Sequence, residues 1–373
     1  MIPRHVGLNA LWLAPGASGG PETYLRGLVP ALVAAFPRTR FTVVTSRSGE
    51  AALRADGWDA LCRVRSLPCE EGERGRRQLA EQVLLPALAR RARFDVLHST
   101  ASVAPVRAGV PHAITLHDVT FFRERTFGAV TTFGMRQVVG RAAQHADALI
   151  TAAAAARDEI CAVLGLDPGR FSVVPHGVSQ GPPADPAPEA EVRARYGLDG
   201  AAVVLCVAAK RPHKNQELLV RALALLPEGV RLVLAGHPEA YDAVLRALAA
   251  DTGVADRVTF ADWVPDADLE GLWALADVAA FPTRGEGFGL PVVEALARGV
   301  PVVCSDIPVL REVGGGLPRT FPPDDPAAAA AAIAAALRDG ADPAAERAWA
   351  ARFTWDAAAQ GTFEAYERAC ASA

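Results

Sequence analysis

Residues 285–294, GEGFGLPVVE, carry the densest set of candidate chemical groups in the chain. They follow an apolar run at 278–281, so the glycines form a turn that exposes backbone N–H groups at the end of a strand. A helix that begins near Leu290 places Glu294 about one turn inside it. Glu286 can accept a hydrogen bond from a sugar hydroxyl, and Glu294 can accept two from a ribose diol. Alternatively, Glu294 has no ligand and only stabilises the helix, because acidic side chains are favourable near a helix N-terminus.

A cationic loop, residues 208–215 (AAKRPHKN), follows another apolar run and opens a further predicted helix. It holds Arg211 and both lysines of the chain, Lys210 and Lys214, although Lys and Arg together number 38. Cations at a helix N-terminus oppose the helix dipole unless an anion binds there. The loop therefore indicates a bound diphosphate, with a solvated surface loop as the alternative.

Two features of the first half of the chain also follow predicted strands. The loop at residues 15–22 (PGASGGPE) places Gly19 and Gly20 before a helix, where their backbone could approach a phosphate or a sugar oxygen. A plain tight turn is the alternative. His117 comes directly after an apolar run at 113–116. It could donate to sugar hydroxyls or stabilise developing charge, or it could cap a helix or bind a loop carbonyl.

All four features lie at the carboxyl ends of strands in an alternating pattern of short apolar runs and helical stretches. This alternation predicts an α/β fold with doubly wound, mostly parallel sheets. The predicted strands are 6–12, 41–45, 96–98, 113–116, 148–151, 171–174, 203–207, 231–235, 258–260, 278–281 and 300–304. The predicted helices are 22–35, 76–91, 133–145, 215–226, 240–252, 267–276, 290–298 and a broken helical tail from 325.

A Pro-rich segment, residues 180–188 (QGPPADPAP), interrupts this rhythm, and a length of 373 residues suits two domains. We predict an N-terminal Rossmann-like domain over 1–179, a linker over 180–192, and a second Rossmann-like domain over 193–354. Open α/β sheets bind ligands at the carboxyl ends of their strands, so an interdomain cleft is the expected site.

The composition limits partners and compartment. A formal net charge of −4 provides no global basic field, so nucleic acid is not an expected partner. Scattered cysteines without metal-type spacing, no signal-peptide pattern and no long apolar span predict a cytoplasmic protein with reduced thiols. Arginine-rich stretches at 74–77 and 90–93 could bind an anionic acceptor or a membrane surface. Alternatively they flank a solvated helix, and the interspersed glutamates favour this interpretation.

The spacing of Glu286 and Glu294, followed by ALARG and VPVV, resembles the signature of the family-four retaining glycosyltransferases, or glycosyl transferases group 1. Members have the B-type fold of two Rossmann-like domains. The glycine-rich first loop, the His-Asp pair at 117–118, PHGV at 175–178 and HKN at 213–215 are similar to further landmarks of that family, in the same order.

The resemblance implies a role for each matching position. Glu294 would hold the donor ribose, Glu286 would contact the transferred hexose, and Lys214 would bind the diphosphate and stabilise it as it leaves. His117 would lie near the anomeric centre. The remaining donor contacts would come from Gly19, Gly20, Lys210, Arg211, Gly287, Phe288, Gly289 and Leu290. In this fold the last helix commonly returns to the first domain, which implies the same for residues 355–373.

The prediction is thus a retaining hexosyltransferase that uses a UDP-, GDP- or dTDP-linked sugar and needs neither a cofactor nor a metal. The acceptor is a glycan, a lipid-linked sugar or a small molecule. Many family members carry an arginine where this chain has Ala209, so Lys210 or Arg211 must supply the second cation, or the site has one fewer. The alternatives are a nucleotide-sugar epimerase or an inverting transferase of the same fold, or a non-catalytic nucleotide-sugar-binding protein.

Overall fold

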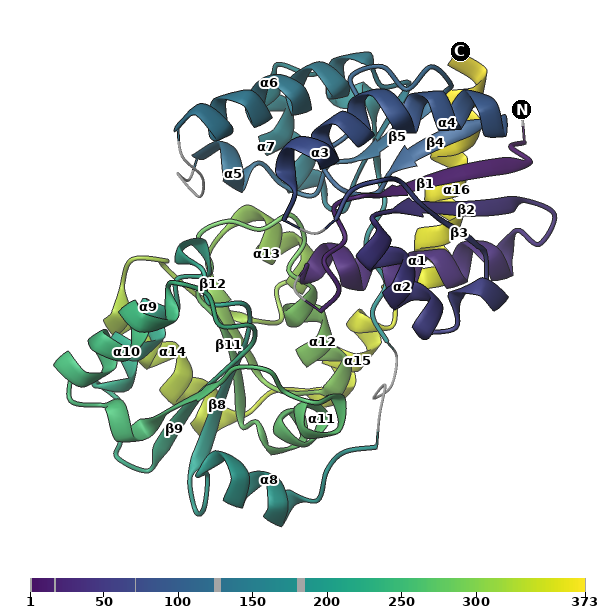
Figure 1. Cartoon of the computed structure of the whole chain (residues 1–373). Helices are drawn as coiled ribbons and strands as arrows, with labels where there is room; N and C mark the ends of the chain where they lie inside the picture. The colour runs from purple at the N-terminus through teal and green to yellow at the C-terminus, as the bar shows by residue number, and fades with distance from the viewer. Residues whose placement is uncertain (1, 17, 71, 124–128, 180–184, 373) are drawn as a thin grey trace. The chain divides into compact units, whose positions relative to one another are not determined.

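The computed structural model of the chain describes residues 2–16, 18–70, 72–123, 129–179 and 185–372. The chain forms two compact units, one of Met1–Gly177 with Trp355–Ala373 and the other of Val178–Thr354. Each unit is built around one parallel sheet with helices packed on it (Figure 1). The predicted α/β fold class with two Rossmann-like domains is confirmed.

The sheet of the first unit has seven strands in the order β3-β2-β1-β4-β5-β6-β7, all in parallel pairs. Strands β1, β4, β5 and β6 are buried along their whole length, as expected for parallel strands with helices on both faces. The strands are β1 (His5–Ala10), β2 (Arg40–Thr45), β3 (Arg63–Ser66), β4 (Val96–Ser99), β5 (His112–Thr115), β6 (Ala148–Thr151) and β7 (Phe171–Val173).

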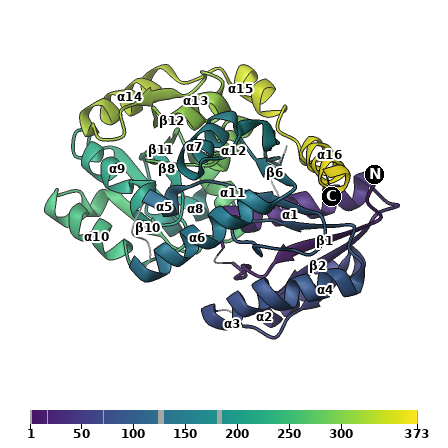
Figure 2. The ribbon, with the colours of Figure 1, turned by 90° about the horizontal axis from the view of Figure 1, so that it is seen from above.

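Helices cover both faces of this sheet, with α1 and α2 on one side and α3, α4 and α6 on the other (Figure 1). The last helix, α16, packs along α1 (Figure 2). The helices of this unit are α1 (Gly20–Ala35), α2 (Arg47–Ala55), α3 (Arg74–Leu79), α4 (Leu85–Ala92), α5 (Thr120–Arg123), α6 (Ala129–His145), α7 (Ala154–Leu164) and α16 (Trp355–Ser372).

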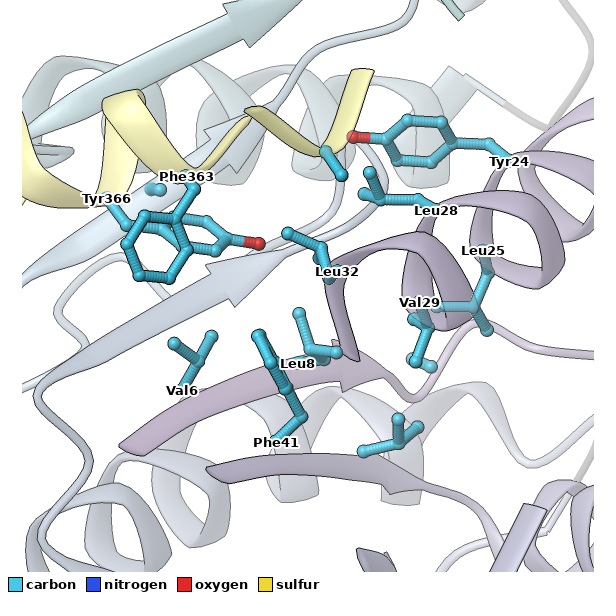
Figure 3. Packing of buried hydrophobic residues seen from close by; sticks show 14 of the residues in the cluster. Val6, Leu8, Tyr24, Leu25, Leu28, Val29, Leu32, Phe41, Phe363 and Tyr366 are labelled. Atoms are coloured by element: carbon cyan, nitrogen blue, oxygen red, sulfur yellow. The ribbon is translucent and has the colours of Figure 1, made fainter. Parts of the chain in front are cut away.

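An apolar cluster joins β1 to α1 and α16 (Figure 3). Leu8, Leu28 and Tyr366, one from each of these elements, are fully buried in it. Trp355 at the start of α16 packs against Gly27 and Gly177, because a Cβ would lie 2.0 Å from the indole on Gly27 and 2.6 Å from it on Gly177. The return of residues 355–373 to the first unit therefore depends on small residues in that unit.

The sheet of the second unit has six strands in the order β10-β9-β8-β11-β12-β13, again in parallel pairs. The strands are β8 (Ala202–Val207), β9 (Val230–Ala235), β10 (Val258–Ala261), β11 (Val278–Phe281), β12 (Val302–Ser305) and β13 (Arg319–Phe321). The helices are α8 (Glu189–Tyr196), α9 (Gln216–Leu223), α10 (Asp242–Asp251), α11 (Asp266–Leu275), α12 (Leu290–Arg298), α13 (Pro308–Gly314), α14 (Pro326–Asp339) and α15 (Pro343–Ala350).

In each sheet the strand order reverses beside the first strand of the unit. The reversal falls between β1 and β4 in the first unit and between β8 and β11 in the second. Connections from two such neighbours leave toward opposite faces of the sheet, which opens a crevice at the carboxyl ends of the strands. The loops after β1, β4, β8 and β11 are therefore the ones that can hold a ligand.

Two predicted elements differ in the structure. Helix α8 begins at Glu189, inside the predicted linker, because Pro188 suits the residue before a helix and Glu189 and Glu191 favour its first turn. The linker residues 180–184 lie outside the described ranges. The single helix predicted over 76–91 contains a π-helical turn at Ala80–Leu84, next to Pro86, which lacks the N–H that a regular turn would use.

Candidate active site

The loop that carries Lys214 is fastened to the loop after β11. It forms a short 3₁₀ turn, Pro212–Lys214, and ends at Asn215, whose φ of 57° is in the left-handed region. The Asn215 side-chain amide donates to the carbonyl of Pro282 at 2.9 Å. The backbone N–H of Arg284 donates to the carbonyl of His213 at 2.8 Å. These bonds hold the two loops at the strand reversal between β8 and β11 in one arrangement.

Lys214 and Glu286 meet at this point. The Lys214 ammonium donates to Glu286 Oε1 at 2.6 Å, and their side chains are 23% and 17% exposed. Both line a small pocket with the end of β8, the end of β11, and Gly289 and Pro291 at the start of α12. The free space is only about 20 Å³, enough for one water. A larger anion there would have to draw Lys214 away from Glu286.

Glu294 lies in the second turn of α12 and is half-buried. Its neighbour one turn on, Arg298, forms a bidentate ion pair with Glu270 instead, with Arg298 Nε donating to Glu270 Oε2 at 3.0 Å. Among the described residues, no group donates a hydrogen bond to the Glu294 carboxylate. Burial raises the pKa of Glu294, the charge of Arg298 lowers it, and the charge of Glu270 raises it further. A half-buried acceptor without a partner suits a ligand with hydroxyl groups.

The glycine-rich turn has its shape because Gly289, the residue before α12, adopts a left-handed conformation. Gly289 has φ 90° and ψ 50°, and a Cβ there would lie 2.6 Å from Leu310. The Phe288 ring is buried, with its centroid 5.6 Å from that of Phe353, so its side chain is part of the core. What Gly287, Phe288, Gly289 and Leu290 can offer to a ligand is the backbone of a helix N-terminus, as predicted from their positions.

The structure separates the two lysines of the cationic loop. Lys210 is fully buried, and its ammonium donates to the carbonyl of Gly236 at 2.8 Å and to Asp262 Oδ1 at 3.0 Å. Arg211 Nε donates to Glu239 Oε1 at 2.6 Å. These partners bury the Lys210 ammonium outside the residues that line the pocket beside Lys214, so its predicted contact with a diphosphate stays a prediction. Arg211 is paired with a carboxylate, which leaves Lys214 as the loop's cation nearest the pocket.

The loop after β1 is ordered by its own side chains. Ser18 Oγ accepts from the backbone N–H of Ala14 at 2.8 Å, and Glu22 Oε2 accepts from the N–H of Gly16 at 2.9 Å. Gly19 precedes α1 with φ 61° and ψ −137°, a conformation that favours glycine. Gly20 is exposed, and a Cβ there would meet no atom within 4 Å. Nothing in the described protein requires a glycine at position 20.

His117 follows β5, and its Nε2 lies 3.0 Å from the Thr100 carbonyl oxygen. Its ring packs edge-on against Tyr24, with centroids 5.1 Å apart. Burial lowers the pKa of His117, so the neutral ring donates from Nε2–H to Thr100 and leaves Nδ1 as an acceptor. In this rotamer His117 is placed to accept from a hydroxyl at Nδ1, whereas the sequence-based prediction is donation to a sugar hydroxyl.

Three residues of these sites were missed by sequence reasoning. Asn215 fastens the lysine loop, Glu22 binds the first glycine-rich loop, and Arg298 pairs with Glu270 and the Glu294 backbone carbonyl but not with the Glu294 carboxylate. Position could have identified Glu22, since an acid in the first turn after a glycine-rich loop can bind that loop's N–H groups. The partners of Asn215 and the Glu270 partner of Arg298 are distant in the sequence, so no local pattern predicts them.

Two features are absent from the described ranges. No three His, Cys, Asp or Glu side chains there gather in an arrangement suited to a metal ion. Within the same ranges, none of the helices is both long enough and apolar enough to cross a membrane.

Two family models match the chain. "Glycosyltransferase Family 4" matches residues 18–180, and "Glycosyl transferases group 1" matches residues 189–352. A D-inositol 3-phosphate glycosyltransferase of Acidothermus cellulolyticus is 34% identical over 309 residues, which cover 74% of this chain and 68% of the relative. The chain belongs to the glycosyl transferases of group 1. The family assignment made from the Glu286 and Glu294 spacing is confirmed.

Solved structures agree on the fold of this glycosyltransferase. Sucrose-phosphate synthase from Thermosynechococcus elongatus matches with a TM-score of 0.76 at 22% identity, covering 99% of this chain and 100% of that one. Anabaena HepE in complex with UDP and glucose matches with a TM-score of 0.71 at 21% identity, covering 98% and 95%. At these identities the likeness supports the two-domain B-type fold and not a particular substrate.

Proposed function

We propose that this glycosyltransferase transfers a hexose, with retention of configuration, from a UDP-, GDP- or dTDP-linked donor to an acceptor hydroxyl. The observation that carries the proposal is the arrangement at the reversal between β8 and β11. There a lysine and a glycine-rich helix N-terminus stand on the two loops that can hold a ligand, and a carboxylate without a partner lies in the second turn of α12. These groups match the diphosphate and the ribose of a nucleotide sugar.

Each group has a distinct task in this proposal. The N–H groups at the start of α12 and the Lys214 ammonium bind the diphosphate, and Glu294 accepts hydrogen bonds from the ribose diol. When Lys214 turns toward the phosphate, Glu286 is released to accept from a hydroxyl of the hexose. The ion pair thus holds the Lys214 ammonium and the Glu286 carboxylate side by side at the place where the diphosphate and the hexose would bind.

The reaction proceeds at one face of the sugar. As the bond from the anomeric carbon to the diphosphate oxygen breaks, that oxygen gains negative charge and takes the proton of the acceptor hydroxyl. The acceptor oxygen then bonds to the anomeric carbon from the side that the diphosphate has left. Lys214 stabilises the charge on the leaving oxygen, which grows toward the transition state.

A second cation for the diphosphate would come from Arg284 in place of the missing arginine at Ala209. Arg284 is exposed, and its backbone N–H is bonded to His213 in the lysine loop. Among the described residues its guanidinium has no ion-pair partner, unlike those of Arg211 and Arg298.

In the first unit we propose that Gly19 and Gly20 approach the donor phosphate and that His117 Nδ1 accepts from a sugar hydroxyl near the anomeric carbon. The acceptor is a glycan, a lipid-linked sugar or a small molecule; the relative named D-inositol 3-phosphate glycosyltransferase supports a small polyol. We place the enzyme in the cytoplasm, because its six cysteines are unpaired.

Two measurements test the proposal. Melting temperatures with UDP, GDP, ADP and dTDP should rise for the base that the enzyme uses, since binding to the folded state alone stabilises it. NMR of the product formed from the matching α-linked donor should show an α-linkage. A β-linked product would replace retention with inversion, and a protein that binds no nucleotide would leave the proposal without support.

Activity is expected to survive an excess of EDTA, because Lys214 and the N-terminus of α12 supply the charge that a metal would otherwise provide. Initial rates with and without EDTA, and after adding manganese, check this. A rate that vanishes on chelation and returns with manganese would contradict metal independence.

Gly20→Ala is expected to lower kcat/KM for the donor by roughly 10-fold, because a methyl group would occupy the place where a phosphate meets the backbone. Stability should hold or rise slightly, since Gly20 is a helical residue with open space at its Cβ. Gly75→Ala is the matched control, because Gly75 also is a helical glycine with open space. Equal activity of the two variants would remove Gly20 from the site.

A further inference from the structure

A groove of about 300 Å³ opens in the first unit at the amino ends of β1, β2 and β3. The glycine-rich loop follows β1 at its other end, and a six-residue strand spans roughly 20 Å. The groove is therefore separate from the loops assigned to the donor. It is lined by His5, Arg40, Thr42, Arg63, Arg65, Leu88, Arg91, Ala92 and Phe94.

The strand register explains why arginines gather here. His5 pairs with Arg40, and Thr42 pairs with Arg63, so these side chains and that of Arg65 project from one face of the sheet. Helix α4 packs on this face, and Phe94 after it lies against Gly7, where a Cβ would be 2.2 Å from the ring. On the edge strand β3, the side chains on this face are those of Arg63 and Arg65, and both are exposed.

The four arginines of the groove lack acidic partners. In the part of the chain that the structure describes, none of Arg40, Arg63, Arg65 and Arg91 forms an ion pair with a carboxylate. Many other arginines of the chain do, including those at 26, 54, 193, 211, 246, 298 and 311. The formal net charge of the protein is −4, so these arginines form a positively charged patch on a protein that is negatively charged overall.

Hydrogen bonds at the base of the groove position the Arg40 side chain. Arg40 Nη2 donates to His5 Nδ1 at 3.2 Å, so the proton of the imidazole is on Nε2, which donates to Thr42 Oγ1 at 2.9 Å. Burial and the charge of Arg40 lower the pKa of His5. The carboxylate of Asp95, the acid that acts on His5, accepts instead from the backbone N–H groups of Arg4 and His5 at 2.8 and 2.9 Å.

We propose that this groove is a second ligand site, which binds a small molecule through a phosphate or diphosphate group. Guanidinium groups bind phosphate oxygens in pairs of parallel hydrogen bonds, and several of them converge on this one volume. Leu88, Ala92 and Phe94 form an apolar wall for the organic part of the ligand. The site does not depend on the proposed donor chemistry, because its residues and its strand ends are different.

Inorganic pyrophosphate is the probe, titrated calorimetrically into the whole protein. Because pyrophosphate should also enter the donor site, the titration is done in a Lys214→Ala background. Adding Arg63→Gln and Arg65→Gln should weaken binding at least roughly 10-fold. The matched control is Arg38→Gln with Arg221→Gln, which removes the same charge from exposed arginines outside the groove. Equal affinity of the two double variants would overturn the proposal.

A second arm distinguishes a free phosphate ester from a lipid headgroup. Phosphatidylcholine vesicles with and without phosphatidic acid are sedimented with the protein. Sedimentation that requires phosphatidic acid and is lost with Arg63→Gln and Arg65→Gln assigns the groove to a headgroup. Pyrophosphate binding without sedimentation assigns it to a soluble ligand. If neither pyrophosphate nor phosphatidic acid binds, the arginines of β3 serve only to charge an exposed sheet edge.

Discussion

Replacing Lys214 with alanine is expected to lower the turnover number by roughly 10²-fold or more, the effect of losing one preorganised charge from the leaving group. The ammonium lies at the strand reversal and lines the pocket at the start of α12. Charge on the diphosphate oxygen grows as the glycosidic bond breaks, so the loss should appear in kcat more than in donor affinity. Single-turnover rates with saturating donor measure it.

The cost in folding stability should be small. The ion pair with Glu286 is partly open to solvent, and such pairs contribute about 1 kcal/mol or less. Lys214→Arg should restore only part of the rate, because a planar fork does not replace a compact charge. A Lys214→Ala enzyme that binds the donor and turns over at the normal rate would remove Lys214 from the mechanism.

Lys210 provides the internal comparison. Its buried ammonium donates to the Gly236 carbonyl and to Asp262, whose side chain is 45% exposed, so Lys210→Ala should destabilise the fold by about 1–3 kcal/mol, the cost of removing a buried hydrogen-bond partner. The melting temperature should therefore fall sharply for Lys210→Ala and barely for Lys214→Ala, while turnover per folded molecule should show the reverse order. A large loss of turnover in folded Lys210→Ala would mean that this lysine does act on the donor.

The two lysines also show what the sequence could and could not predict. Strand-then-loop patterns placed the candidate loops correctly, because in a parallel sheet every loop at a carboxyl end lies on the same edge. Which lysine points to the pocket depends on Asp262 and Gly236, which are contributed by the ends of other strands. Such partners are invisible to local periodicity, as is the groove at the amino ends of β1–β3.

Short elements were missed for a related reason. The edge strands β3 and β13 read RVRS and RTF, and only one face of each needs apolar residues. By contrast, β8 and β11 are buried on both faces and were recognised from continuous apolar runs. Prediction was thus best where burial dictates residue type, and weakest where a side chain's role is set by distant partners.

Glu294→Gln is expected to raise the KM for the donor by roughly 10- to 100-fold, because a carboxylate that accepts from both ribose hydroxyls loses one acceptor oxygen and its charge. Arg298 cannot compensate, since Glu270 holds it in a bidentate pair. The effect should be in KM with little change in kcat, because the ribose contact is the same in the ground state and the transition state.

The pH dependence gives this prediction a second test. Burial raises the pKa of Glu294, so the wild-type carboxyl takes up its proton at a pH above the ordinary glutamate range. In wild type, donor KM should therefore increase as the pH falls through that raised pKa, and in Glu294→Gln it should stay high and independent of pH.

The stability of the fold should depend on the same group. The folded state binds the proton of Glu294 more tightly than the unfolded state, so the contribution of Glu294 to stability is largest at low pH and is lost as the pH rises through the raised pKa. At pH 8 the neutral glutamine avoids the cost of burying a charge, and Glu294→Gln should melt higher than wild type while binding the donor more weakly. A variant that melts lower and keeps the wild-type KM would show that Glu294 is a structural acid of α12 and not the ribose ligand.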